Sequence, residues 1–345
     1  MAVQTVLVCE TQVPFVTGGA ESLVRGLVDR LRAAGYETDL VSIPFKWYPK
    51  DEILAHAAAW RLLDLTESDH KPVDVVICTK FPTYFVRHPN KVVWLTHQHR
   101  AAYDLCGTEF SDFTHVDLDV GLRERLHALD REMLGECRRR YSISVNTAER
   151  LQRFNGLKAE PLYHPPSLAD RLHHDSYGSY VLSVGRLNRM KRVDLAIDAM
   201  PHVHESLRLI VAGEGPDEEM LRGKANDAGV AHRVEFRGRV GEEALVDLYA
   251  NARAVVYPPY DEDYGYVTLE AFLARKPVVT TTDSGGPLEF VEHDVSGIVC
   301  EPEAQALAAA LNTLDEPRAR ALGEAGHARA SGITWDGVIE SLVSG

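Results

Sequence analysis

The stretch RAVVYPPYDEDYGYVTLEAFLARKPVVTT, residues 253–281, predicts a strand, a turn, a helix and a second strand in succession. Its two outer segments are short, apolar and β-branched, as in strands that a parallel sheet buries on both faces. Glu262 lies in the turn and Glu270 in the helix that follows Gly265. These carboxylates fit three roles, namely a catalytic pair, ligands of a metal ion, or a helix cap with a solvated face.

The same alternation of strands and helices fills both halves of the 345-residue chain. The first half begins with the strand TVLVC (5–9), and the second restarts at YVLSVG (180–185) after a proline- and histidine-rich linker. We therefore predict an α/β fold of two Rossmann-like, doubly wound domains that face a central cleft. Their predicted bounds are 1–166 and 179–333, with the linker at 167–178.

The formal net charge of -14 argues against bulk electrostatic binding to nucleic acid or to an anionic membrane. CRRRYS (137–142) is either a local basic patch or the solvated end of a helix. No apolar stretch approaches 18 residues and no signal peptide is visible, so we expect no transmembrane segment. Peripheral membrane contact stays open. Five widely spaced cysteines without a CxxC pair fit a reducing, cytoplasmic location.

Several glycines and cations follow predicted strands in the second half. SVGRLNRMK places Arg186 and Lys191 after a strand, where they would suit a diphosphate or form a solvated basic turn. In LIVAGEGP, Gly213 is placed to approach a ligand.

The opening stretch carries two further kinds of ligand-binding group. Gly265 lets the chain bend, and the amides of residues 265–267 can face a phosphate from a helix N-terminus. The two glutamates would then accept hydrogen bonds from sugar hydroxyls. Asp261, Glu262 and Asp263 also form a D-x-D pattern that can bind Mg²⁺ or Mn²⁺, but cations at 186 and 191 make a metal unnecessary.

Two features of the first half are also candidates. Gly18 and Gly19 precede a helix, where they either expose amides to an anion or form a tight turn with positive φ. His97 and His99 follow a strand on one side of an extended segment. They could serve a metal, bind a sugar or orient an acceptor, or be structural.

Taken together, these motifs resemble the retaining family 4 glycosyltransferases of the GT-B fold. The resemblance rests on SVGRLNRMK, IVAGEGP, FRGRV, DEDYGYVTLEAFLARKPVVTT and DSGGPLEFVEHDVSGIV, and it continues through GGAE, WLTHQH and SVNT…LYHPP. It covers most of the chain. It implies a retaining transfer of a hexose-type sugar from a UDP- or GDP-sugar to a hydroxyl acceptor, with no metal and no cofactor. It also implies that the last helix, within 334–345, packs back on the N-terminal domain.

The resemblance assigns roles residue by residue. Arg186 and Lys191 would hold the diphosphate, Glu262 the transferred sugar and Glu270 the ribose, while His97 would lie near the reacting sugar with His99 as its competitor. The remaining donor-binding residues that it implies are Gly18, Gly19, Gly213, Arg237, Val240, Gly265, Tyr266 and Val267.

The sequence departs from the family pattern at two places. Asn188, Arg189 and Met190 replace a common Pro-Glu-Lys, and Arg275 and Lys276 replace small residues. The alternatives are an inverting transferase, a hydrolysing epimerase, or a non-catalytic nucleotide-sugar-binding protein. The sugar, the base and the acceptor are not specified by the sequence.

Overall fold

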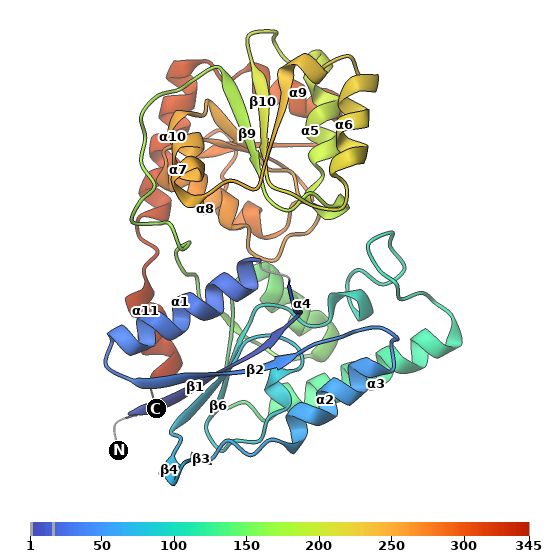
Figure 1. Ribbon diagram of the computed structural model, residues 1–345, viewed down its shortest axis with the longest axis vertical. Coiled ribbons are helices and arrows are strands. Elements are labelled where there is room, and N and C mark those ends of the chain that lie inside the picture. Colours follow the sequence, from blue (N-terminus) through green and yellow to red (C-terminus); the bar gives the residue numbers. More distant parts are fainter. Residues whose placement is uncertain (1–2, 16–17, 345) are drawn as a thin grey trace. The chain divides into compact units, whose positions relative to one another are not determined.

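The computed structural model describes residues 3–15 and 18–344 and divides the chain into two compact units. Unit 1 comprises the chain up to His164 together with its end from Thr334, and unit 2 runs from Pro165 to Ile333. Each unit is a six-stranded parallel sheet with helices on both faces (Figure 1). The predicted α/β class with two doubly wound units is therefore confirmed.

The sheet of unit 1 has the strand order β2-β1-β5-β6-β7-β8. All four residues of its strand β5 are buried, as expected for a strand covered on both faces. A two-stranded antiparallel ribbon, β3 (Glu67–Ser68) with β4 (Lys71–Pro72), lies outside it. The strands of the sheet are β1 (Thr5–Gln12), β2 (Glu37–Pro44), β5 (Val75–Cys78), β6 (Lys91–Leu95), β7 (Arg139–Ser142) and β8 (Glu160–Pro161).

Five helices of the described chain cover this sheet. α1 packs against β1 through apolar residues at helical spacing, among them Leu23, Leu27 and Leu31, and α11 packs beside it. The other three helices cover the opposite face (Figure 1). The bounds are α1 (Gly19–Ala33), α2 (Glu52–Leu62), α3 (Asp117–Gly135), α4 (Val145–Asn155) and α11 (Trp335–Val343).

Contacts near both ends of the C-terminal helix α11 fix it to the rest of unit 1. Trp335 meets Trp94 edge to face, with ring centroids 6.1 Å apart. The guanidinium of Arg139 donates to the carbonyls of Ser341 at 2.9 Å and Leu342 at 3.2 Å. A cation at the end of a helix satisfies carbonyls that have no partner within the helix.

The prediction that CRRRYS forms the solvated end of a helix is wrong. α3 ends at Gly135, and Arg139 begins strand β7, which pairs in parallel with β6. Arg139 and Arg140 donate to backbone carbonyls. The apolar side chains of this strand are few, which is why its pattern resembled a charged helix end.

Unit 2 has the strand order β11-β10-β9-β12-β13-β14. Its strands are β9 (Tyr180–Val184), β10 (Arg208–Ala212), β11 (Val234–Gly238), β12 (Ala254–Val256), β13 (Val278–Thr281) and β14 (Gly297–Cys300). Its helices are α5 (Val193–Ala199), α6 (Glu218–Asp227), α7 (Glu242–Asn251), α8 (Tyr266–Leu273), α9 (Ala304–Asn312) and α10 (Glu316–Ala330).

The helices of unit 2 form two layers. α5, α6 and α9 share one apolar cluster with the sheet, and α10 packs against α8 on the other face (Figure 1). The sequence did not predict α7 or α10. α10 is rich in alanine and glycine, and Gly326 lies against the ring of Phe272. Small residues at such a contact give a weak apolar period.

Within the described residues, no helix is both long and apolar enough to cross a lipid bilayer.

A buried carboxylate lies in the core of unit 1. Asp130 of α3 is fully buried and accepts a hydrogen bond from the Tyr103 hydroxyl at 2.6 Å. Burial raises the pKa of Asp130 to about 7, although the bond from Tyr103 favours the ionised form. The unfolded chain releases this proton at a lower pH than the folded chain does. The free energy of unfolding therefore falls as the pH rises from about 4 to 7.

Replacing Asp130 should therefore change the pH dependence of stability. Asp130→Asn keeps an acceptor for Tyr103 and removes the charge. We expect it to raise the free energy of unfolding by about 1–3 kcal/mol at pH 8 and by little at pH 4. Urea unfolding across this pH range measures the difference, with the exposed Asp29→Asn as control. A stability difference that is the same at both pH values would contradict the assignment.

Candidate active site

The loops that follow β9 and β12 form the centre of the candidate site. These two strands are neighbours in the sheet, whereas the connection from β9 leads to β10 on its other side. Such a reversal of strand order leaves a crevice at the carboxyl ends of the strands, where open α/β sheets bind ligands. Lys191 follows β9 and Glu262 follows β12.

The side chains of Lys191 and Glu262 meet in an ion pair. The ammonium of Lys191 also donates to the Tyr257 hydroxyl at 3.3 Å. Burial alone would lower the pKa of Lys191, but the charge of Glu262 outweighs it and raises that pKa well above its ordinary value. Lys191 is therefore charged at neutral pH, and both side chains remain about one fifth exposed.

Arg192 fastens the same loops together. Its guanidinium donates to both carboxylate oxygens of Asp283, at 2.6 and 2.8 Å. It also donates to the carbonyls of Pro258 at 2.7 Å and Pro259 at 2.8 Å. Burial by itself would raise the pKa of Asp283, but Arg192 outweighs burial and lowers that pKa. A bidentate pair of this kind fixes geometry as well as charge, so Arg192 positions the chain that carries Glu262.

The backbone of the Glu262 loop is held on both sides. The amide of Glu262 donates to the Ser284 carbonyl at 2.9 Å, and its carbonyl accepts from Gly286 at 2.7 Å. On the other side, the amide of Tyr260 donates to the Met190 carbonyl at 2.8 Å. The loop after β12 is thus tied to the loops after β9 and β13.

Helix α8 starts next to this loop. Gly265 is its N-cap, with φ of 83°, and a Cβ there would come within 2.8 Å of the Pro287 ring. Both facts require glycine. Since the first amides of a helix have no acceptor within it, Tyr266 and Val267 direct theirs toward the N-terminal side. The positive end of the helix dipole lies there as well.

Glu270 lies one turn further along α8 and accepts a hydrogen bond from the Tyr249 hydroxyl at 2.7 Å. Burial raises the pKa of Glu270, and the bond from Tyr249 partly opposes this. The carboxylate is therefore fixed in orientation by a residue of α7, a helix that the sequence did not predict.

The ends of β9, β10 and β11 approach one another closely. A Cβ on Gly213 would lie 1.8 Å from the carbonyl oxygen of Gly185, and the Gly213 amide donates to the Gly238 carbonyl at 2.8 Å.

Arg237 is exposed and pairs with Glu235 at 2.7 Å, and Val240 is half-buried in the loop that follows β11. Arg186 is exposed, and its side chain makes no ion pair with the described residues.

In unit 1, the structure places Gly18 at the N-cap of α1. Its φ is -152°, so the predicted tight turn with positive φ is wrong. The Gly18 amide donates to Glu21 at 2.8 Å, and Lys80 donates to the other oxygen of Glu21 at 2.8 Å. Burial by itself would raise the pKa of Glu21, but Lys80 outweighs burial and lowers that pKa. Gly19 is the first residue of α1.

His97 and His99 differ in their surroundings. His99 lies among the rings of Phe45, Phe81 and Phe113, and its Nε2 is shielded from solvent without a hydrogen-bond partner among the described residues. Burial, and then the charge of His97, lowers the pKa of His99 to about 4. His97 is half-buried, and its Nδ1 lies 2.7 Å from the Gln98 carbonyl. A proton on Nδ1 would make Nε2 the acceptor.

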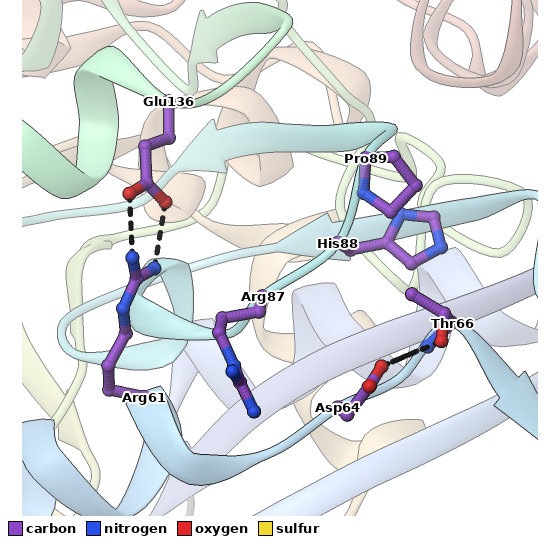
Figure 2. Close-up of a pocket in the computed structure, with 7 residues that line it drawn as sticks. All are labelled: Arg61, Asp64, Thr66, Arg87, His88, Pro89 and Glu136. Atoms are coloured by element: carbon purple, nitrogen blue, oxygen red, sulfur yellow. Dashed lines mark hydrogen bonds and ion pairs between the residues drawn. The ribbon is translucent and has the colours of Figure 1, made fainter.

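A separate pocket of ≈ 350 Å³ lies at the opposite, amino-terminal edge of the unit 1 sheet. Figure 2 shows Arg61 reaching the Glu136 carboxylate there with two hydrogen bonds of 2.8 Å. Glu136 also accepts from the buried Lys91 at 3.0 Å. These contacts join α2, β6 and the end of α3, so they are structural and do not belong to the candidate active site.

No cluster of three or more His, Cys, Asp or Glu side chains is placed to hold a metal ion within residues 3–15 and 18–344. The site residues that sequence reasoning missed are Tyr249, Tyr257, Arg192 and Asp283. The sequence did show that Arg192 follows Lys191 and that Asp283 follows β13, but not that they meet.

A family model and several known proteins match this chain. The family model of the glycosyl transferases group 1 matches residues 169–329. An uncharacterised glycosyltransferase of Methanocaldococcus jannaschii is 26% identical over 333 residues, covering 84% of this chain and 83% of that one. The human alpha-1,3/1,6-mannosyltransferase is 32% identical over 168 residues, which cover 43% of this chain and only 40% of the relative.

Solved structures are similar over nearly the whole chain. Sucrose-phosphate synthase from Thermosynechococcus elongatus has a TM-score of 0.77 at 19% identity and covers 98% of this chain and 97% of that one. Anabaena HepE, solved in complex with UDP and glucose, has a TM-score of 0.71 at 17% identity, with 98% of both chains covered. At these identities the likeness establishes the fold.

Breaking the Arg192–Asp283 pair should destabilise unit 2. Asp283→Asn leaves the guanidinium half-buried without its counter-charge, so we expect a loss of about 1–3 kcal/mol in the free energy of unfolding. The exposed pair of Arg222 and Glu218 provides a control, since Glu218→Gln should change stability by less than about 0.5 kcal/mol. Equal effects of the two variants in denaturant unfolding would contradict the positioning role.

Proposed function

Because the chain belongs to the glycosyl transferases group 1 family and has the GT-B fold, we propose that this glycosyltransferase uses a nucleoside diphosphate sugar as donor. The transferred sugar is a hexose, the acceptor is a hydroxyl group, and the anomeric configuration is retained, as in family 4. The observation that carries this proposal is the Lys191–Glu262 pair at the strand reversal of unit 2.

The donor diphosphate is bound by cations and by helix amides. Lys191 is charged, partly exposed and fixed at the end of β9, while Arg186 offers a planar donor fork at the same strand end. The amides of Tyr266 and Val267 and the positive end of α8 add to this anion site. When a diphosphate binds, the Lys191 ammonium exchanges Glu262 for phosphate oxygens, and Glu262 is released to accept hydrogen bonds from sugar hydroxyls.

The nucleoside is bound by the neighbouring elements. Glu270 is oriented by Tyr249 and presents carboxylate oxygen to the ribose hydroxyls. The close approach of Gly213 to Gly185 brings backbone beside the phosphates. The backbone from Arg237 to Val240 borders the base. UDP is the first candidate nucleotide, since the similar HepE was solved with UDP and with UDP-glucose, and GDP is the second.

Chemistry follows from charge placement. As the bond to the leaving phosphate breaks, Lys191 and Arg186 neutralise the developing negative charge, which lowers the barrier. Glu262 positions the oxocarbenium-like sugar without attacking it. The acceptor oxygen bonds to the anomeric carbon on the face that the phosphate leaves, and an oxygen of that phosphate takes the proton of the acceptor hydroxyl. His97 is assigned a place near the reacting sugar, where its Nε2 accepts a hydrogen bond when its Nδ1 donates to the Gln98 carbonyl. Gly18 and Gly19 are proposed to donate amides to the diphosphate, for which the Gly18 amide would exchange its bond to Glu21 for a phosphate oxygen.

The reaction as proposed takes place in the cytoplasm and without a metal. Two cations and a helix N-terminus supply the charge that Mg²⁺ supplies in other nucleotide sites. All five cysteines are free thiols, which fits a reducing compartment.

Lys191 can be tested by nucleotide binding. We expect UDP in large excess to raise the stability of the wild-type protein by about 2–3 kcal/mol. Lys191→Ala should weaken UDP binding roughly 100-fold and reduce the transfer rate at least as much, because it loses charge-assisted bonds to the leaving group. Lys224→Ala, which removes a lysine of α6 paired with Asp198, is the matched control.

Thermal shift and calorimetry measure both variants. If Lys191→Ala binds UDP as tightly as the wild type, the diphosphate assignment is wrong.

The metal-independent, retaining reaction gives a second test. We expect the rate to stay within about twofold when excess EDTA is added, since the protein supplies the counter-charge. Proton NMR of the product should show the anomeric configuration of the donor. Inversion of that configuration, or a loss of rate that Mg²⁺ restores, would contradict the mechanism.

A further inference from the structure

Glu10 is a buried carboxylate that the fold does not use. It lies in β1, two residues before the strand ends, and only 7% of the residue is exposed. Its side chain makes no hydrogen bond or ion pair with another residue of the described chain. A buried charge without a partner costs stability, so the position of Glu10 calls for a ligand.

The topology of unit 1 places Glu10 where a ligand is expected. β1 is the first strand of its sheet, with β2 on one side and β5 on the other, so the strand order reverses beside it. Glu10 is the alignment partner of Ser42, near the carboxyl ends of both strands. Open α/β sheets bind their ligands at such a point.

The alternation of side chains along β1 gives the direction of Glu10. It shares a face with Val6 and Val8, which are both buried, and α1 packs on β1. Because α1 follows β1 directly, its N-terminal end lies at the carboxyl end of the strand. The positive end of the helix dipole therefore lies at the same end of the strand as Glu10.

The cation that follows the neighbouring strand does not neutralise Glu10. Lys80, two residues after the end of β5, donates to Glu21 at 2.8 Å, and both side chains are about nine-tenths buried. Glu21 in turn accepts from the Gly18 amide. Lys80 and Glu21 pair with each other, so Lys80 is not left to pair with Glu10.

We propose that Glu10 binds the sugar acceptor and selects among acceptors by their charge. Its carboxylate accepts hydrogen bonds from hydroxyl or ammonium groups of the acceptor and disfavours an acceptor that brings a phosphate to this position. The inference rests on the proposed function, because it concerns the second substrate of the same reaction. An acceptor with an ammonium group should bind most tightly, since a hydrogen bond between ionised groups is about twice as strong as a neutral one.

The test uses the full chain with UDP-glucose as donor and three acceptor probes, namely glucosamine, glucose and glucose 6-phosphate. UDP release gives kcat/KM for each probe. We expect the wild type to favour glucosamine over glucose 6-phosphate by about tenfold or more. Glu10→Gln keeps the shape but removes the charge, so it should reduce this ratio at least about tenfold while the Kd for UDP stays unchanged.

Stability separates this role from a structural one. Removing a buried charge that has a structural partner lowers the stability of a protein. Glu10→Gln should instead leave the thermal midpoint of unfolding equal or higher. Glu124→Gln, an exposed residue of α3, controls for loss of one negative charge.

An unchanged probe ratio in Glu10→Gln, or no response of the wild type to any probe, would overturn the inference while UDP binding still supports the donor site. If the wild type does not bind UDP, the proposed function fails first.

Discussion

The ion pair between Lys191 and Glu262 joins two loops that are 71 residues apart in the chain. It forms because β9 and β12 are neighbours at the point where the strand order reverses. Arg192 and Asp283 hold the backbone on either side, so the loops stay together without the Lys191–Glu262 ion pair. A charge pair that is supported in this way can open for a ligand without unfolding its surroundings, and the donor site depends on that property.

Much of this site could be predicted from the sequence, because apolar runs and glycine turns mark the ends of strands. Lys191, Glu262 and Glu270 each stood out by their position after or within a predicted element. Their contacts could not be predicted, since side-chain pairs depend on strand order. Arg192 directly follows Lys191 and had no assigned role, but in the structure it makes five hydrogen bonds to the loops after β12 and β13 and to the last residue of β13.

The two units show different limits of sequence reasoning. In unit 2, the partner of Glu270 comes from α7, whose weak pattern gave no prediction. In unit 1, two histidines with the same spacing from their strand differ because only His99 is surrounded by aromatic rings. Glu10 directly follows the predicted strand 5–9, and its burial follows from the cover that α1 provides. Burial of a polar group is a property of packing that a single sequence does not encode.

The central claim is that the Lys191–Glu262 pair is the resting form of the donor site. A crystal structure with UDP-glucose bound tests it most directly. The account predicts that the Lys191 ammonium lies within hydrogen-bonding distance of a diphosphate oxygen and that the Glu262 carboxylate accepts from hexose hydroxyls. A structure in which the ion pair persists while the diphosphate binds elsewhere would contradict it.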